Sequence, residues 1–147
     1  DGVFTDGKIY IGPYEEELRI FSVHDGLGIK MLIDAGFEVG IISGMEIQTV
    51  RARFEKLGVK HFYQGAVDKT VPYERIITQL SLQDSHVLYM GDDLPDLPLI
   101  VRSGIGVSVP NAVLEVKKAA NFITTRSGGD GAVREICDLI LSRKLAK

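Results

Sequence analysis

Apolar residues recur along this chain with two different periods, which alternate from residue 25 onward. Helical spacing predicts helices over residues 25–35, 45–57, 71–80, 97–102, 112–119 and 132–145. Short apolar runs between them predict buried strands over 39–42, 61–63, 87–90, 106–109 and 122–123. Strands that alternate with helices form a parallel sheet covered by helices on both faces. The pattern therefore predicts an α/β fold with a Rossmann-like parallel sheet flanked by helices.

The first residues follow a different pattern, which predicts a β-hairpin over residues 8–22. Apolar runs at 8–11 and 18–21 flank Gly12-Pro13-Tyr14, a turn signal. An isolated hairpin is only marginally stable in water, and these strands carry more apolar residues than a solvated hairpin needs. An exposed apolar edge also invites pairing. We expect the hairpin to pack against another subunit, and a hairpin folded back onto its own domain is the alternative.

Composition narrows the class of protein. The 147 residues fit a single domain, 1–147. The net charge of −3 disfavours nucleic acid as a partner, because phosphate backbones attract basic surfaces. No apolar run is long enough to span a bilayer, so no membrane partner is expected. The lone cysteine, Cys137, lies on an apolar helical face and predicts a buried core residue in a reducing, cytoplasmic protein.

Four short polar segments lie beside the ends of predicted strands or the starts of predicted helices: Asp1-Gly2, Ser43-Gly44, Asp68-Lys69 and Asp92-Asp93. In open α/β sheets the carboxyl ends of the strands meet at one edge, where ligands bind. Taken singly, each segment could be a turn, a helix cap or solvated surface. As an ordered set they favour one catalytic site.

The same segments resemble the haloacid dehalogenase superfamily of phosphatases, and within it the small capless branch that acts on sugar-acid phosphates. The resemblance is carried by residues 1–7, 21–30, 43, 63–65, 69, 91–96 and 128–135. It implies a Mg²⁺-dependent phosphoric monoester hydrolase of Rossmann-like fold, with a β-hairpin near the N-terminus and no large cap domain. It also implies a homotetramer assembled through the hairpin, with a phosphorylated sugar acid as substrate.

The resemblance implies catalytic roles for Asp1, Ser43 and Lys69. Asp1 would protonate the leaving alkoxide and then deprotonate water, while its backbone carbonyl binds the metal. Backbone N–H groups of Gly2 and Val3 would hold the transferring phosphoryl oxygens. Ser43 would donate a hydrogen bond to a phosphate oxygen, and Lys69 would neutralise phosphate and nucleophile.

The remaining site residues follow from the same resemblance. Gly44 would lie against the phosphate beside Ser43. Asp92 would bind Mg²⁺, Asp93 would bind or orient a metal-bound water, and Asp96 would support them from behind.

The C-terminal segment, 128–147, is a glycine hinge followed by a helix. The resemblance implies that it reaches toward a neighbouring subunit's site, where Arg126 or Arg134 would touch the substrate. His24, His61 and His86 show no metal-ligand spacing and are interpreted as structural or surface residues.

In the family, the nucleophilic Asp lies two positions before the residue that Asp1 matches, on the first strand of the sheet. The sequence begins at Asp1. We therefore expect the natural protein to be longer and to carry both features. A protein that truly began here would not hydrolyse phosphate esters by this mechanism.

The substrate stays open between two sugar acids. Met45 stands where octulosonate phosphatases commonly have Arg and nonulosonate phosphatases commonly have Glu, and Glu46 comes one position late. We expect 3-deoxy-D-manno-octulosonate 8-phosphate first, with a nonulosonate 9-phosphate as the alternative. A non-catalytic oligomerisation module of a sugar-activating enzyme is a further alternative. A phospho-receiver domain is disfavoured because its acidic pair would come early, whereas Asp92-Asp93 comes late.

Overall fold

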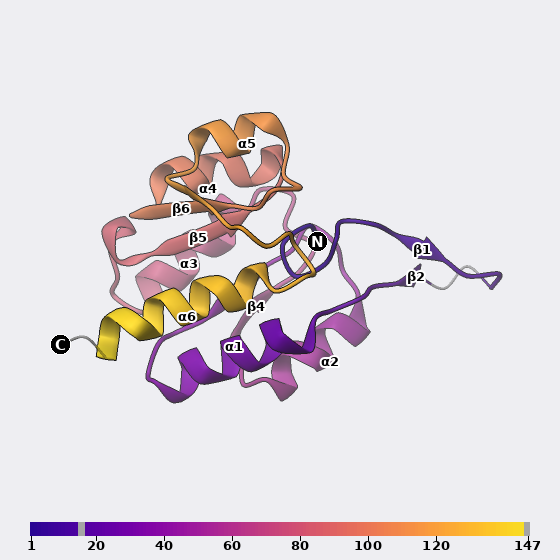
Figure 1. Cartoon of the computed structure of the whole chain (residues 1–147), viewed down its shortest axis with the longest axis horizontal. Helices are drawn as coiled ribbons and strands as arrows, with labels where there is room; N and C mark the ends of the chain where they lie inside the picture. The colour runs from indigo at the N-terminus through magenta and orange to yellow at the C-terminus, as the bar shows by residue number, and fades with distance from the viewer. Residues whose placement is uncertain (15–16, 146–147) are drawn as a thin grey trace.

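A computed structural model describes residues 1–14 and 17–145 of the chain. Helices and parallel strands alternate through it, as the hydrophobic pattern predicts (Figure 1). The strands are β3 Gly40–Ile42, β4 His61–Tyr63, β5 Leu88–Gly91, β6 Ile105–Ser108 and β7 Phe122–Ile123. The helices are α1 Val23–Asp34, α2 Gln48–Lys56, α3 Thr70–Gln79, α4 Leu97–Arg102, α5 Leu114–Ala119 and α6 Ala132–Leu145, with short 3₁₀ turns η1 Asp84–His86 and η2 Leu94–Asp96.

The parallel sheet is divided into two parts. β3 pairs with β4 in one part, and β5, β6 and β7 pair in that order in the other. Helices α1 and α6 lie side by side in front of the strands, and α3 lies behind them in contact with β3 (Figure 1). Helices on both faces of parallel strands confirm the predicted α/β class.

An aromatic cluster forms the centre of the core between α1, α2, α6 and β4. The Phe54 ring lies 4.8 Å from Phe4, 5.8 Å from Phe21 and 5.5 Å from Phe62, measured between ring centroids. Cys137 is buried in the same core, as predicted, and burial raises the pKa of its thiol to about 12. The thiolate is the reactive form, so this cysteine is chemically inert at neutral pH.

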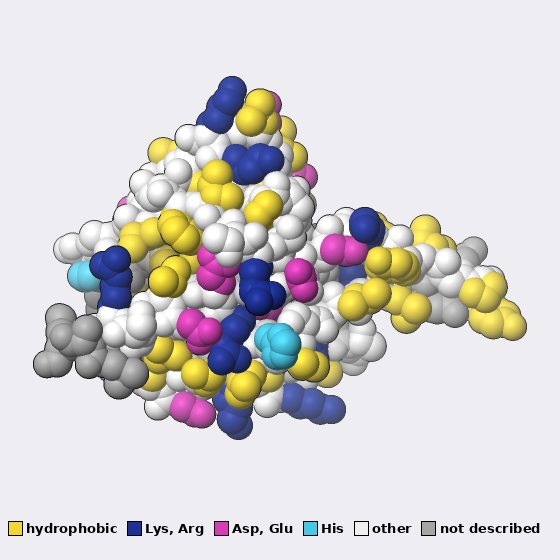
Figure 2. Space-filling view, in the orientation of Figure 1, with side chains coloured by type: hydrophobic (Ala, Val, Ile, Leu, Met, Phe, Trp, Pro, Cys, Tyr) yellow, Lys and Arg dark blue, Asp and Glu magenta, His cyan; other side chains and the backbone are white. Residues whose placement is uncertain are grey.

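The hairpin projects from the body of the molecule (Figure 1). Its strands, β1 Tyr10–Ile11 and β2 Glu17–Leu18, pair antiparallel and are shorter than the predicted runs at 8–11 and 18–21. Residues 15–16 of the hairpin, and residues 146–147 of the predicted C-terminal segment, lie outside the described residues. Apolar side chains cover much of the surface of the hairpin (Figure 2). One of them is Ile11, which is 74% exposed.

Two helices begin later than their apolar pattern predicts. α2 starts at Gln48 rather than at residue 45, because Ile47 is extended and the Ser43 hydroxyl accepts a hydrogen bond from Met45 N in a turn. α5 starts at Leu114 because the N–H of Val113 donates to the carbonyl oxygen of Asp92. Both shifts occur where the chain contributes to the polar edge of the sheet.

No helix in the described part of the chain is long and apolar enough to cross a membrane.

Candidate active site

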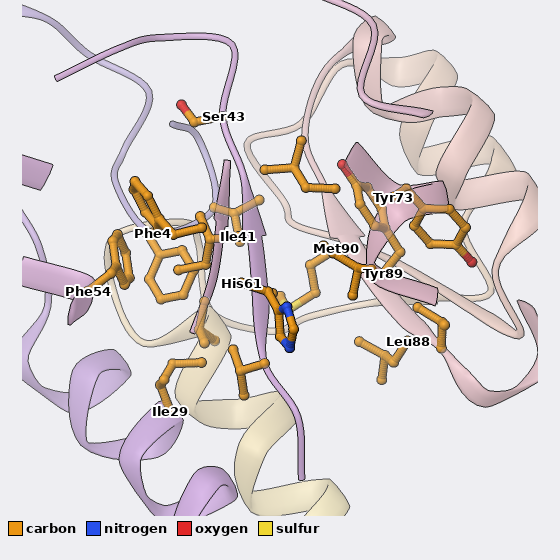
Figure 3. A pocket seen from close by; sticks show the side chains of 18 of the residues that line it. Phe4, Ile29, Ile41, Ser43, Phe54, His61, Tyr73, Leu88, Tyr89 and Met90 are labelled. Carbon is orange, nitrogen blue, oxygen red and sulfur yellow. The ribbon is translucent and has the colours of Figure 1, made fainter. Parts of the chain in front are cut away.

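A cavity of about 480 Å³ opens between β3 and β5, the facing edges of the two parts of the sheet. Its walls are apolar: Phe4, Ile29 and Phe54 line one side and Tyr89 and Leu88 the other (Figure 3). Its polar lining comes from the predicted segments. Asp1, Ser43, Lys69, Asp92 and Asp96 all contribute to it. The structure thus brings together side chains that are far apart in the sequence.

Asp96 connects several parts of this site. Its Oδ1 accepts from Lys69 Nζ at 2.6 Å and from the Tyr89 hydroxyl at 2.8 Å. Its Oδ2 accepts from the backbone N–H groups of Asp92 at 3.1 Å and Asp93 at 3.2 Å. Only 3% of the side chain is exposed. Because donors occupy both oxygens, Asp96 anchors Lys69 and the loop after β5 and has little capacity left for another ligand.

Asp92 is the carboxylate best placed for a cation. Burial, followed by the negative charge of Asp96, raises its pKa to about 6. Among the described residues, no hydrogen bond to its side-chain oxygens is found. It lies so close to the N-terminal loop that a Cβ added to Gly2 would be 1.7 Å from its Oδ2. A divalent cation would relieve the cost of this buried charge, which fits the predicted Mg²⁺ site.

Asp93 is exposed and caps η2, its Oδ1 accepting from Leu94 N at 2.7 Å. In the described part of the chain, no three His, Cys, Asp or Glu side chains form a ready-made metal cage. Mg²⁺ commonly uses one or two carboxylates together with waters and substrate phosphate, so a half-buried Asp92 at the mouth is compatible with that ion.

The N-terminal loop places Asp1 at the same mouth. Its Oδ1 lies 3.2 Å from Arg19 Nε, and its carbonyl oxygen accepts from Val3 N at 2.5 Å. The N–H of Gly2 donates to the Thr5 hydroxyl at 3.2 Å. The amides predicted to hold phosphate therefore donate within the loop.

Asn111 ties this loop to the glycine hinge. Its Nδ2 donates to Gly2 O at 2.9 Å, and its Oδ1 accepts from Gly128 N at 2.7 Å. Gly129 N also donates to Val3 O at 3.0 Å. A Cβ on Gly128 would lie 1.8 Å from Gly2 O, so only glycine permits this close approach.

Ser43 follows β3 at the rim of the cavity (Figure 3). Its backbone N–H donates to Tyr63 O at 2.8 Å, which continues the pairing of β3 with β4. Its carbonyl accepts from Ala66 N at 3.0 Å, and Gly44 beside it is exposed. These backbone contacts fix the position of the Ser43 hydroxyl.

Comparison with known proteins agrees with this arrangement. Residues 61–136 match the family model of haloacid dehalogenase-like hydrolases. A 3-deoxy-D-manno-octulosonate 8-phosphate phosphatase of Yersinia pestis is 44% identical over 141 residues, which cover 96% of this chain and 75% of that protein. The chain belongs to the haloacid dehalogenase-like hydrolase family.

Solved structures of haloacid dehalogenase-like hydrolases superpose closely. A hydrolase of that superfamily from Legionella pneumophila, 48% identical, has a TM-score of 0.96 over 99% of this chain and 80% of its own. The 3-deoxy-D-manno-octulosonate 8-phosphate phosphatase of Moraxella catarrhalis, in complex with magnesium, phosphate and KDO, is 40% identical. It has a TM-score of 0.93, with 97% of this chain and 82% of the other covered.

Arg126 and Arg134 of this haloacid dehalogenase-like chain lie in a separate hollow beside α1 and α6. Arg134 Nε pairs with Asp138 Oδ1 at 2.8 Å, and the N–H of Arg126 donates to Glu135 at 3.0 Å. Neither arginine lines the cavity between β3 and β5. Their predicted contact with a neighbouring subunit's substrate stays a prediction.

The predicted set of site residues omits two side chains that hold the site together, Arg19 and Asn111. Asn111 has a weak sequence signal, because Pro110-Asn111 follows a predicted strand end as the other site segments do. Arg19 has no such sequence signal. It lies in an apolar run of the hairpin, where a charged side chain is usually interpreted as solvent-exposed. Two of the histidines fit their interpretation as structural or surface residues. His61 is buried beside Glu38, with 3.6 Å between Nε2 and Oε2. His86 Nδ1 accepts a hydrogen bond from Gln83 N.

Proposed function

We propose that this chain is a cytoplasmic Mg²⁺-dependent phosphatase that hydrolyses 3-deoxy-D-manno-octulosonate 8-phosphate and releases a sugar acid for lipopolysaccharide precursor synthesis. The observation that carries the proposal is the gathering of Asp1, Ser43, Lys69 and Asp92 at one polar mouth. Relatives of that activity match 96% of the chain, which supports the substrate class.

In this proposal Asp92, Asp93 and the Asp1 carbonyl hold Mg²⁺, which neutralises charge on the phosphoryl oxygens. Lys69, held by Asp96 at 2.6 Å, places its ammonium beside the same oxygens as a point charge. Its orientation is fixed before substrate arrives, so little reorganisation is needed in the transition state.

The other contacts to phosphate come from the Ser43 hydroxyl and from the backbone N–H of Gly44. The N–H groups of Gly2 and Val3, which donate within the loop here, join them once the loop rearranges around phosphate. Asp1 gives a proton to the leaving alkoxide and later takes one from water. The reaction also needs a nucleophilic carboxylate, which the family motif places two positions before Asp1. Activity is therefore measured on the natural protein, once its N-terminal residues have been read by intact mass and sequencing.

The test is phosphate release from 3-deoxy-D-manno-octulosonate 8-phosphate and from a nonulosonate 9-phosphate, each with Mg²⁺ and with excess chelator. We expect Mg²⁺-dependent turnover that favours the octulosonate ester. Lys69→Met should lower kcat/KM by about a hundredfold or more, as when one stabilising donor is removed. A preference for the nonulosonate ester would correct the substrate, and no turnover of either would favour an assembly role.

Asp68→Asn is the matched control for Lys69→Met. Asp68 precedes Lys69 and accepts from Thr70 N at 2.9 Å on the exposed side of the same turn. The substitution removes a nearby charge, keeps an oxygen that can accept from Thr70 N, and does not touch the mouth. Turnover should stay at the wild-type level.

We also propose that the protein forms a homotetramer through the hairpin. Ile11, Leu18 and Ile20 are 74%, 59% and 59% exposed, which is an apolar surface that water does not favour. A neighbour packed there would also bring its own C-terminal segment near this open site, where Arg126 or Arg134 would contact the sugar acid.

Light scattering on the wild type and on Ile11→Asp/Leu18→Asp tests the assembly. The wild type should have the mass of a tetramer, and the double variant should have the mass of a smaller species. A wild-type monomer with full phosphatase activity would refute the assembly proposal and leave the reaction intact.

A further inference from the structure

Arg19 is a buried cation that connects the hairpin to the site. Its side chain is only 3% exposed, although it follows the exposed strand β2. Nε lies 3.2 Å from Asp1 Oδ1, and Nη2 lies 3.1 Å from Glu17 Oε2. Nη1 donates to Leu18 O at 3.5 Å. All three branches of the guanidinium therefore have acceptors.

This arrangement fixes Asp1 more than it fixes Arg19. The Asp1 side chain is 42% exposed, and in the described part of the chain Arg19 is the residue that holds its carboxylate. Arg19 has Glu17 and Leu18 as further partners. A planar guanidinium with several acceptors loses little freedom when it binds one more, so it is a rigid support for a half-exposed carboxylate.

The support comes from the hairpin itself. Glu17 pairs with Ile11, and Leu18 pairs with Tyr10, across β1 and β2. This pairing sets the backbone position from which Arg19 reaches the site. A shift of β2 relative to the body would therefore move the Asp1 carboxylate.

We propose that Arg19 is a positioning residue that orients the Asp1 carboxylate for proton transfer and makes this orientation depend on the hairpin. The inference rests on the proposed function, in which Asp1 carries the proton. Displacing a catalytic group by about 1 Å can cost a hundredfold in rate, so such a support affects turnover without touching substrate.

The first test is kinetic, on the natural protein. Arg19→Met should lower kcat by about tenfold to a hundredfold, because the reacting groups are no longer aligned. KM and the Mg²⁺ concentration for half activity should stay unchanged, since Arg19 is not among the residues proposed to hold phosphate or metal. Arg19→Lys should retain part of the rate, because one ammonium reaches Asp1 without holding Glu17 as well.

Glu17→Gln is the matched control. It removes the charge of the other carboxylate on the guanidinium, while the amide oxygen of Gln can still accept from Nη2, so the Asp1 contact is kept and kcat should equal that of the wild type. An equal loss in Glu17→Gln and Arg19→Met would overturn the positioning role, since it would indicate general damage to the hairpin. If Arg19→Met does not fold, unchanged kcat in Arg19→Lys overturns it.

Crystal structures of the same variants separate this inference from the proposed function. The Asp1 carboxylate should occupy one orientation in the wild type and in Glu17→Gln, and a different or mixed orientation in Arg19→Met. An unmoved carboxylate in Arg19→Met would overturn the inference. A wild-type protein without phosphatase activity would instead refute the proposed function, and the crystal structures would still decide the role of Arg19.

Discussion

Asp96 shows how a single side chain can organise a site without contacting the substrate. It receives hydrogen bonds from Lys69, Tyr89 and two backbone amides while 3% exposed. A buried carboxylate is costly unless donors surround it, and here those donors are the site's own parts. The stability of this region and its geometry therefore depend on the same contacts.

Replacing Asp96 with Asn should destabilise the protein by about 3–5 kcal/mol, because it leaves the Lys69 ammonium without its buried partner. The side-chain NH₂ of Asn would also face donors, either the backbone N–H groups of Asp92 and Asp93 or the Lys69 ammonium and the Tyr89 hydroxyl. Urea unfolding measures the loss. Asp68→Asn, an exposed neighbour of Lys69, should unfold as the wild type does, and an equally stable Asp96→Asn would contradict the proposed anchor.

Asp25 makes the stability depend on pH. Burial raises its pKa above the ordinary 3.8, while the backbone N–H groups of Arg134 and Gly131 act in the opposite direction. From 3.8 up to the raised folded value, the folded protein binds more protons than the unfolded chain. Stability therefore falls as the pH rises through this window, and part of it returns on acidification.

Asp25→Asn should remove that slope, and urea unfolding across a pH series from 4 upward measures it. Asp34→Asn, an exposed substitution in the same helix, provides the control and should leave the slope unchanged. A variant at Asp25 that keeps the wild-type pH dependence would show that another group causes it.

Sequence reasoning finds residues that carry a motif and misses residues that only support it. Asp92 and Lys69 are predicted because their positions after a strand and before a helix have chemical meaning. Arg19 and Asn111 act through contacts between segments 18 and 109 residues apart, and no local pattern encodes such pairs. The same limit applies to the amides of Gly2 and Val3, whose partners depend on how the loop folds.

At the scale of elements, the fully buried contact of α2 with the body is made by one side chain. Phe54 is its only buried residue, and it contacts Phe4, Phe21 and Phe62. Phe4 belongs to the N-terminal loop and Phe62 to β4. This ring therefore connects the helix, the loop of the site and one part of the sheet.

Phe54→Ala should cost about 3–5 kcal/mol in unfolding free energy, through lost burial and the cavity left behind. Val50→Ala, a partly buried change in the same helix, should cost clearly less. Denaturant unfolding of both variants provides the comparison. Similar losses at the two positions would mean that α2 packs along its whole length.

Element types are predictable here because the apolar periods are strong, whereas several boundaries are not. α2 begins three residues late because Ile47 is extended after the turn at Ser43. β2 ends at Leu18, before its apolar run does, because the next residue, Arg19, turns inward to Asp1. In each case a contact that is distant in the sequence overrides a local preference.

At the scale of the whole molecule, the division of the sheet separates strands that the hydrophobic pattern cannot distinguish. β6 pairs on both sides, with β5 and β7, whereas β3 and β5 each face the cavity along one edge. The apolar runs predict the strands but not their neighbours, because strand pairing is set by contacts that are non-local in the sequence.

Hydrogen exchange of a protein limited to residues 1–147 should follow this division. The amides of β6, held between two strands, should exchange most slowly, and those of β3 and β5 should exchange sooner through local opening at the cavity. Exchange followed by mass spectrometry or NMR measures the difference. Equal protection of β3 and β6 would mean that the two parts of the sheet open only together.

In a protein limited to residues 1–147, the cavity between β3 and β5 also has a mechanical consequence. Space lined by apolar side chains is poorly filled by water, so the folded protein occupies more volume than its atoms require. Unfolding removes that excess volume, and compression therefore favours the unfolded chain. High-pressure fluorescence should show unfolding at modest pressure, and a larger side chain at Ile41, which lines the cavity, should raise the midpoint.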